Sequence, residues 1–283
     1  MANFLETPSL LSKGVYLQLV VEMKLLDDAI IRSNEQEEVL THHYKDKALG
    51  NRFVIPWRKV KGKLRRLVLE KQRSYNISPH CALKDDLCLT CPSCLLFGGT
   101  GETSSNKVSY NILSRVMGET FISTTQVEVV QNYTQNAVGE KDLKTGQALM
   151  TILTVPKETV FLGTVTIKDP TKEMAAIIAD NLQRLTRIGA RSVEWGRVDT
   201  KILNVRMSDR EDISVYHLLQ EPPQEVQQND VAVFITGLPD VEAAYRKLND
   251  QVSEVLAELA DKRSTSRERK PREKQAQPEA GKE

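Results

Sequence analysis

All four cysteines of the chain lie within fourteen residues, and this clustering constrains the local fold more than any other feature. They form the pattern His-Cys-x6-Cys-x2-Cys-x2-Cys, which is His80, Cys81, Cys88, Cys91 and Cys94. A secreted fold of this size would spread disulfides through its core, so we expect a reducing compartment, the cytoplasm. Four thiolates this close together can bind one Zn²⁺ tetrahedrally. We expect a structural zinc knuckle, with His80 as an alternative ligand to Cys81; an iron–sulfur cluster and metal-free thiols are the other interpretations.

The charge of the chain is strongly polarised, although its formal net value is only +1. Residues 57–73 hold eight lysines and arginines against one glutamate, whereas residues 208–261 hold twelve acidic residues against three basic ones. A basic stripe of this density is typical of a surface that binds a polyanion. A solvated helix face is the alternative.

Within the basic stripe, Pro56 is expected to end an extended segment, and Lys61-Gly62-Lys63 to open a helix. The first-turn N–H groups and the helix dipole would then attract an anion, and a nucleic-acid phosphate chain is the natural ligand. The residues of this segment expected to contact the nucleic acid are Arg58, Lys59, Lys61, Gly62, Lys63, Arg65 and Arg66.

A loop with two glycines is a second candidate phosphate contact. Gly189 and Gly196 enclose it, and we expect Arg187, Arg191 and Arg197 to touch phosphates or a base. The alternative is that Gly189 only caps the preceding helix.

Hydrophobic periodicity predicts an α+β fold. Apolar residues alternate from Val15 to Leu25, as in a strand with one face on a core, whereas residues 27–54 are polar and irregular. Two β-prone arms around the polar segment 131–147 predict a projecting hairpin. Further strands are expected at Thr159–Ile167, Val198–Val205 and Val231–Thr236.

Two helices follow the 3.6-residue period, one from Thr171 to Ile188 with Gly189 as its C′ glycine, and one from Pro239 to Leu259. This order fits a sheet with helices on one face, the ferredoxin-like arrangement. Residues 262–283 contain no aliphatic side chain larger than alanine, and we expect them to be disordered.

Membrane insertion and familiar catalytic motifs are not indicated. No apolar stretch approaches about 18 residues, so no membrane partner is expected. The histidines form neither a Ser/His/Asp order nor an His-Glu-x-x-His motif. Asp27-Asp28 could bind a cation, but an acidic pair at a strand end is more often simply solvated.

These residues resemble the backbone subunits of the CRISPR-associated RAMP superfamily. Ile55-Pro56 followed by Lys61-Gly62-x-Leu64-Arg65 matches the family motif I-P-G-S-S-L-K-G-x-L-R, and Leu96-Phe97-Gly98 matches its downstream L-F-G. Trp57-Arg58-Lys59 replaces Gly-Ser-Ser, and Glu194-Trp195 replaces a glycine near Gly196. The cysteine knuckle before L-F-G is most like the Csc group of type I-D complexes. The resemblance spans roughly residues 14–205.

The resemblance implies an RRM-like palm (residues 14–33 and 156–261), fingers with the Lys-Gly motif and the cysteines (34–125), and a thumb hairpin (126–155). Such subunits are non-catalytic and polymerise head-to-tail along crRNA. The expected partners are crRNA, target nucleic acid paired to it, further copies of the chain, and the large, small and crRNA-end-capping subunits. Base pairing between guide and target then reads the sequence.

Two other functions stay open on the sequence. One is a RAMP-type endoribonuclease that processes guides or cuts target RNA, for which Asp46 in the polar excursion, or Asp28, would supply the acidic group. The other is a stand-alone zinc protein that binds RNA as a monomer.

Overall fold

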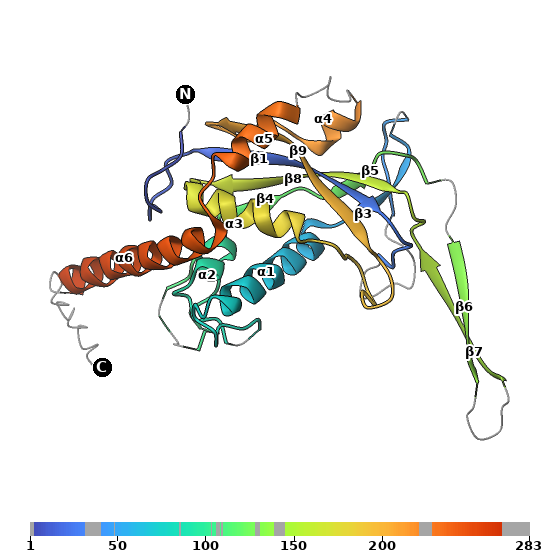
Figure 1. The fold of residues 1–283 in the computed structure, drawn as a ribbon, viewed down its shortest axis with the longest axis horizontal. Coiled ribbons are helices and arrows are strands. Elements are labelled where there is room, and N and C mark those ends of the chain that lie inside the picture. The colour runs from blue at the N-terminus through green and yellow to red at the C-terminus, as the bar shows by residue number, and fades with distance from the viewer. Residues whose placement is uncertain are drawn as a thin grey trace, which may run out of the picture.

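An antiparallel sheet forms the centre of the fold in the computed structural model (Figure 1). The structure describes residues 3–31, 41–47, 49–84, 86–102, 104–105, 108, 110–127, 131–138, 145–220 and 228–267. Over this part of the chain the sheet has seven strands in the order β2-β3-β5-β8-β1-β9, with β4 paired to β8. The strands are β1 Tyr16–Leu25, β2 Thr41–His43, β3 Asn51–Ile55, β4 Val116–Gly118, β5 Phe121–Ser123, β8 Val160–Lys168 and β9 Val198–Ser208.

The central strand β1 confirms the predicted alternation. Leu17, Leu19, Val21, Met23 and Leu25 are fully buried in the main core. β8 and β9 flank β1, both antiparallel to it. The expected α+β class is therefore correct, with the described strands paired antiparallel.

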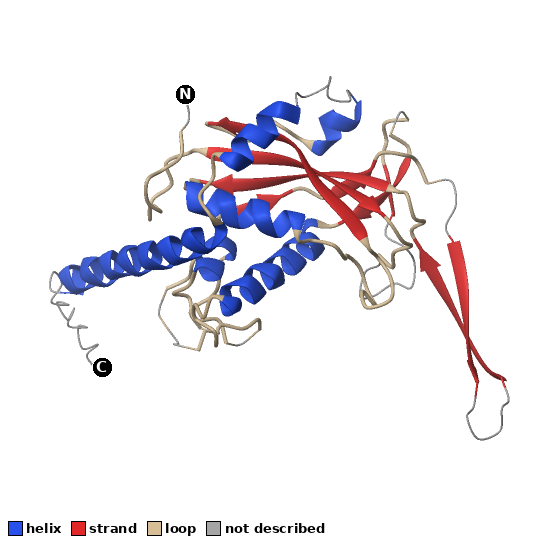
Figure 2. Ribbon diagram, in the orientation of Figure 1, coloured by secondary structure: helices blue, strands red, loops and turns tan. Residues whose placement is uncertain are grey.

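Helices cover both faces of the sheet (Figures 1 and 2). The helices are α1 Trp57–Ser74, α2 Pro92–Phe97, α3 Lys172–Gln183, α4 Val215–Gln220, α5 Gln228–Thr236 and α6 Val241–Arg267. α1 and α3 lie on the face that holds the main core, and α6 packs across α3. On the opposite face, Val215 of α4 packs with Val54, Ile122 and Leu162 of the sheet. The expectation that helices cover only one face of the sheet is therefore wrong, because α4 packs on the opposite face.

The segment Val231–Thr236 is helical, so the strand expected there is wrong. It forms the second part of α5, which lies along the edge strand β9. Val231 is 8% exposed whereas Val233 is 70% exposed, and Phe234 packs on the main core. Burial at positions three apart is the helical pattern, whereas a strand would have buried Val231 and Val233 together.

The helix from Thr171 is shorter than expected. Thr171 is its N-cap, since its Oγ1 accepts a hydrogen bond from the Met174 amide at 3.3 Å. However, α3 ends at Gln183, and Gly189 is not its C′ residue. Gly189 instead lies in a later loop at φ +94°, where a Cβ would stand 2.6 Å from the Ile30 carbonyl oxygen. The need for close backbone approach explains this glycine better than helix capping does.

The polar excursion and the hairpin also differ from expectation. Residues 27–54 contain β2 and most of β3, and Phe53 and Ile55 of β3 are buried. A separate two-stranded sheet, β6 Gln131–Val138 with β7 Thr145–Thr154, projects from the body (Figure 1). The strands extend into the segment expected to be the polar tip; residues 128–130 and 139–144 lie outside the described part.

Helix α6 runs to Arg267, so residues 262–267 of the expected disordered tail are helical. Once a helix is anchored by packing, each added residue costs little, and lysine and arginine propagate helices well. The rest of the expected tail, 268–283, lies outside the described residues. Among the helices that are described, none has the length and apolar character needed to span a membrane.

Candidate nucleic-acid interface and metal centre

Helix α1 begins at Trp57, four residues before Lys61, so Lys61-Gly62-Lys63 does not open it. Pro56 has extended geometry (φ −56°, ψ 139°) and precedes the first helical residue. The free N–H groups of a helix belong to its first four residues, and the Lys-Gly motif lies in the second turn. The expected capture of a phosphate by helix-terminal N–H groups at Gly62 is therefore wrong, and contact at this motif depends on side chains and open space.

One face of α1 is basic and accessible. Arg58 and Arg66 are exposed, and Gly62 stands between them at the i, i+4, i+8 spacing. A Cβ placed on Gly62 would have no atom within 4 Å, so the space above it is open. Lys59 and Lys63 flank this line and are half-buried. We call Arg58, Lys59, Gly62, Lys63 and Arg66 the basic face.

A second face of α1 lies against the main core. Val60, Leu64 and Val68 are fully buried in the main core. Lys61 is half-buried; burial, and then the charge of Arg65, lowers the pKa of its ammonium group. Lys61 and Arg65, one turn apart on α1, are half-buried beside the basic face and belong to the same run of sequence.

A third stripe of α1 holds the cysteine segment. Arg65, Leu69 and Arg73 follow one another at i, i+4, i+8. Leu69 packs in one apolar cluster with Cys81, Cys91 and Cys94. The Arg73 guanidinium donates a hydrogen bond of 2.9 Å to the Cys81 carbonyl oxygen. On the sequence alone, Arg73 has no role beyond the charge of the basic stripe. The i, i+4, i+8 spacing of Arg65, Leu69 and Arg73 is the sequence feature that places the three side chains on one side of the helix.

The four cysteine sulfurs lie within 4.8 Å of one another. The distances from Cys81 Sγ to Cys94 Sγ and to Cys91 Sγ are both 3.7 Å. Zn–S bonds of about 2.3 Å at tetrahedral angles place sulfurs about 3.8 Å apart, so the spacing fits Zn²⁺. His80 is exposed and outside this group of sulfurs. The four cysteines are therefore close enough to bind one metal ion.

The cysteine thiols perturb one another strongly. Hydrogen bonds with its neighbours, that with Cys81 first, lower the pKa of Cys88 far below its usual value. Hydrogen bonding with Cys81 raises the pKa of Cys91 and of Cys94. The pKa is thus lowered for Cys81 and Cys88 and raised for Cys91 and Cys94, and a bound cation would favour the charged form of all four because metal ligands bind as thiolates.

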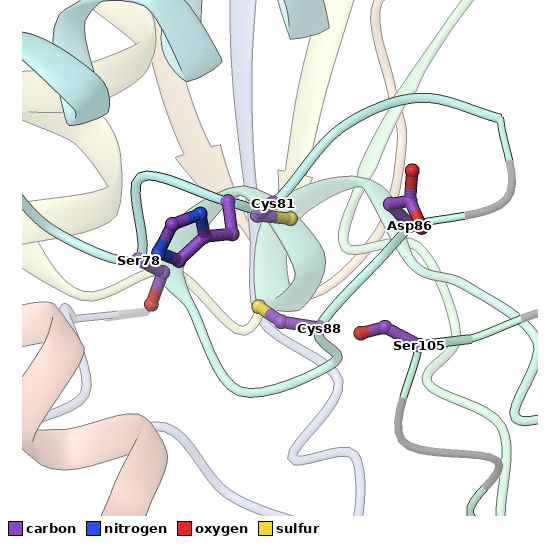
Figure 3. A pocket seen from close by; sticks show the side chains of 6 residues that line it. Ser78, Cys81, Asp86, Cys88 and Ser105 are labelled. Carbon is purple, nitrogen blue, oxygen red and sulfur yellow. The ribbon is translucent and has the colours of Figure 1, made fainter.

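A pocket of about 510 Å³ opens beside the cysteines, lined by Ser78, His80, Cys81, Asp86, Cys88 and Ser105. Figure 3 shows the sulfurs of Cys81 and Cys88 toward its centre, with Asp86 and Ser105 around them. Cys91 and Cys94 are fully buried, whereas Cys88 is half-buried. Through this pocket a metal ion or a chelator can reach the sulfurs of Cys81 and Cys88.

The loop over residues 185–198 folds against the segment after β1. The Gly196 amide donates to the Asp28 carbonyl oxygen at 2.8 Å, and the Leu26 amide donates to the Arg197 carbonyl oxygen at 2.8 Å. Arg187 is half-buried and its guanidinium reaches the Trp195 carbonyl oxygen at 3.4 Å. Arg191 and Arg197 are exposed. Arg187 is thus held within the loop by its guanidinium, whereas Arg191 and Arg197 reach the surface.

The two acidic candidates for catalysis have structural contacts. Asp28 is 6% exposed, and its Oδ1 accepts a 2.7 Å hydrogen bond from the Lys157 amide. Asp46 is half-buried, and its Oδ2 accepts a 2.7 Å bond from the Gln220 side chain of α4. Each carboxylate therefore ties separate segments together.

A family model and several solved structures are similar to this chain. A family model for Csc2 CRISPR proteins matches residues 4–273. The crystal structure of Csc2 from Thermofilum pendens aligns with a TM-score of 0.55 and 19% identity, over 86% of this chain and 82% of that one. A comparison with curated proteins gives no match.

Two structures of larger assemblies are also similar. A chain of a type IV-B CRISPR complex aligns with a TM-score of 0.50 and 12% identity, over 73% of this chain and 100% of that one. A chain of a CRISPR RNA-guided surveillance complex aligns with a TM-score of 0.51 and 11% identity, over 78% and 80%. At these identities the likeness is one of fold.

Proposed function

This chain belongs to the Csc2 family of CRISPR proteins, and on that basis we propose that it is a crRNA-binding backbone subunit of a type I-D effector complex. The basic face of α1 is the observation that carries the proposal. It combines exposed arginines with an open glycine, so a phosphate chain can approach the helix closely. The affinity of such a surface for RNA comes from contacts with phosphates, so it does not depend on the RNA sequence.

We propose that the sheet is a ferredoxin-like, RRM-like palm. The order β5-β8-β1-β9, with each neighbouring pair antiparallel, supports this assignment, as does the placement of α3 between β8 and β9 along the chain. The projecting hairpin β6–β7 supports the role of a thumb, which would separate guide bases. The segment 34–125 would form the fingers.

We propose that Cys81, Cys88, Cys91 and Cys94 hold a structural Zn²⁺. The sulfur spacing supports this ion, which would fix residues 80–97, where α2 is the one regular element among the described residues 80–84 and 86–97. A bound zinc would stabilise the fold around it and keep α2 docked on α1.

We propose that the subunit acts without catalysis. The structural contacts of Asp28 and Asp46 support this over an endoribonuclease. Incubation of the pure protein with repeat RNA and with guide-paired target RNA tests it. Metal-dependent cleavage that is lost in Asp46→Asn would contradict the proposal.

The proposed partners are crRNA, the target nucleic acid paired to it, further copies of the chain placed head-to-tail, and the large, small and end-capping subunits of the complex. The solved CRISPR assemblies with the same fold support this set. The loop arginines Arg191 and Arg197 are exposed and would give secondary phosphate contacts.

The salt dependence of RNA binding tests the basic face. We expect Arg58→Ala with Arg66→Ala to weaken binding equally for unrelated RNA sequences. For single strands each lost phosphate contact reduces the slope of log affinity against log salt by about 0.7, so the double variant should lose about 1.4. Filter binding or fluorescence anisotropy over a salt series measures it.

Arg246→Ala is the matched control, because Arg246 is an exposed arginine of α6 paired with Glu242. Its slope should equal that of the wild type. An unchanged slope in the Arg58/Arg66 variant would remove the basic face from the RNA-binding surface.

A further inference from the structure

Arg65 points at the cysteine sulfurs and not along the basic face. Its Nη2 lies 3.9 Å from Cys94 Sγ. Its guanidinium carbon lies 5.9 Å from the centroid of the Phe97 ring in α2. Its Nε is buried and has no hydrogen-bond partner within the described part of the chain. The side chain is thus held between α1 and the knuckle.

The sulfurs beside Arg65 are among the most buried groups of the molecule. Cys81 is 1% exposed, and Cys91 and Cys94 are 0% exposed. Four thiolates around one divalent cation carry about two negative charges in excess. Buried charge of this size is tolerated only where a counter-charge or hydrogen-bond donors compensate for lost water. A guanidinium is suited to this role because it is always protonated and presents several N–H donors.

We propose that Arg65 is a positioning residue of the metal centre, an outer donor to the Cys94 thiolate, and is not an RNA contact. The inference rests on the proposed metal centre and adds a residue to it. Arg65 stabilises the charged, metal-bound form, while Leu69 and Arg73 on the same stripe of α1 fix the knuckle against the helix. Groups that hydrogen-bond to metal ligands commonly change metal affinity by about 10–100-fold when they are removed.

The position of Arg65 separates it from RNA. Arg58 and Arg66 are exposed, whereas Arg65 is half-buried and its Nη2 lies 3.9 Å from Cys94 Sγ. Arg66 would therefore contact an RNA phosphate, whereas Arg65, the preceding residue, contacts the Cys94 thiolate. Adjacent arginines thus serve different anions.

Zinc release tests this assignment in the full-length protein. The protein is loaded with one equivalent of Zn²⁺, and transfer of the ion to a chromogenic chelator is followed over time. We expect Arg65→Ala to release zinc at least about tenfold faster than the wild type, and Arg66→Ala to release it at the wild-type rate. Arg65→Lys, which keeps the charge, should lie between the two.

Folding and RNA binding are measured on the same samples. If Arg65→Ala does not fold, the comparison of Arg65→Lys with Arg65→Gln replaces it, with slower release expected for the lysine variant. In a folded Arg65 variant the salt slope of RNA binding should stay at the wild-type value. A slope that falls as it does in Arg66→Ala would place Arg65 on the RNA and overturn the inference.

The outcomes separate the inference from the metal centre itself. A wild-type protein that retains no zinc after reconstitution would refute the metal centre. A wild-type protein that holds zinc, with Arg65→Ala releasing it at the same rate, would refute only the role of Arg65.

Discussion

At the scale of single residues, the direction in which a side chain leaves α1 decides its role more than its charge does. Residues 58, 62 and 66 face solvent, whereas residues 65, 69 and 73 face the knuckle. The sequence shows a single basic run, and a run of charge carries no information about which members are buried until the helix is placed against its neighbours. The sequence therefore predicts one RNA-binding role for the whole run, Arg65 included.

Gly62→Ala separates stability from RNA binding. The added methyl group enters open space, so we expect the helix to gain about 1 kcal/mol in free energy of unfolding. If a phosphate chain approaches closely here, the same methyl group must clash with it. An overpacked contact costs about 1–3 kcal/mol, which corresponds to at least about a fivefold loss of RNA affinity.

Denaturant unfolding and RNA titration of Gly62→Ala give the two numbers. A more stable variant with unchanged affinity would show that RNA does not approach the helix at this position. We expect the free energy of unfolding to rise and the RNA affinity to fall.

At the scale of elements, the sequence predicts features that depend on neighbouring residues and does not predict those that depend on tertiary contacts. The alternation in β1, the helical period that starts at Thr171 and the cysteine spacing each depend on residues close in sequence, and all three are present in the structure. The run at Val231–Thr236 is short and β-branched, which fits either a strand or a helix; its contact with β9 and the core makes it helical. The order of the strands could not be derived from any one segment.

We expect the order of residues 80–97 to depend on the proposed zinc ion. It has one short helix and a small apolar cluster formed by the cysteines, Leu69, Leu87 and Leu89. We expect elemental analysis to find about one zinc per chain. Chelation or Cys91→Ser should then increase amide hydrogen exchange in residues 80–97 and leave β1 protected.

Hydrogen exchange is measured by mass spectrometry, and β1 is the internal control. Because β1 belongs to the main core, its amide protection should not change. A metal-free protein with full protection of residues 80–97 would mean that the cysteines pack without an ion.

The docking of α6 on α3 includes an ion pair with a pH signature. Lys247 Nζ lies 2.6 Å from Glu173 Oε1, with the glutamate side chain 6% exposed and the lysine 61% exposed. Burial alone would raise the pKa of Glu173, but the hydrogen bonds, with that from Lys247 first, outweigh it and the pKa lies below its usual value. The resulting stability is present above the unfolded pKa of about 4.3 and is lost as the pH falls through the folded pKa.

Lys247→Met should therefore lower the free energy of unfolding at pH 7 by about 1–2 kcal/mol, less than for a fully buried pair because the ammonium is largely solvated. The difference from the wild type should shrink as the pH falls below 4. Arg246→Met, which breaks an exposed pair, is the control and should cost less than about 0.5 kcal/mol. A difference that stays constant with pH would exclude this ion pair as its source.

At the scale of the whole molecule, charge is divided between the basic face of α1 and the acidic segment 208–261. Head-to-tail stacking needs two different surfaces that match each other, and opposite charge is one way to align them. Asp250 and Glu254 are exposed on α6, the helix that extends from the body (Figure 1). We infer that this acidic side contributes to contact between neighbouring copies.

Assembly on RNA of increasing length tests the inference. Native mass spectrometry should show one further copy for each fixed increment of RNA length, as stacking along a guide requires. Asp250→Lys with Glu254→Lys should reduce the number of copies bound, while one copy still binds a short RNA. A ladder that is insensitive to both salt and this charge reversal would exclude electrostatic docking, and binding as a monomer at every length would contradict the backbone role.

An image of the protein on its guide RNA by cryo-electron microscopy tests the central claim most directly. We expect phosphate density to run along Arg58, Gly62 and Arg66, with Arg65 turned toward the cysteines. Density for the RNA elsewhere, with this side of α1 open to solvent, would contradict the account.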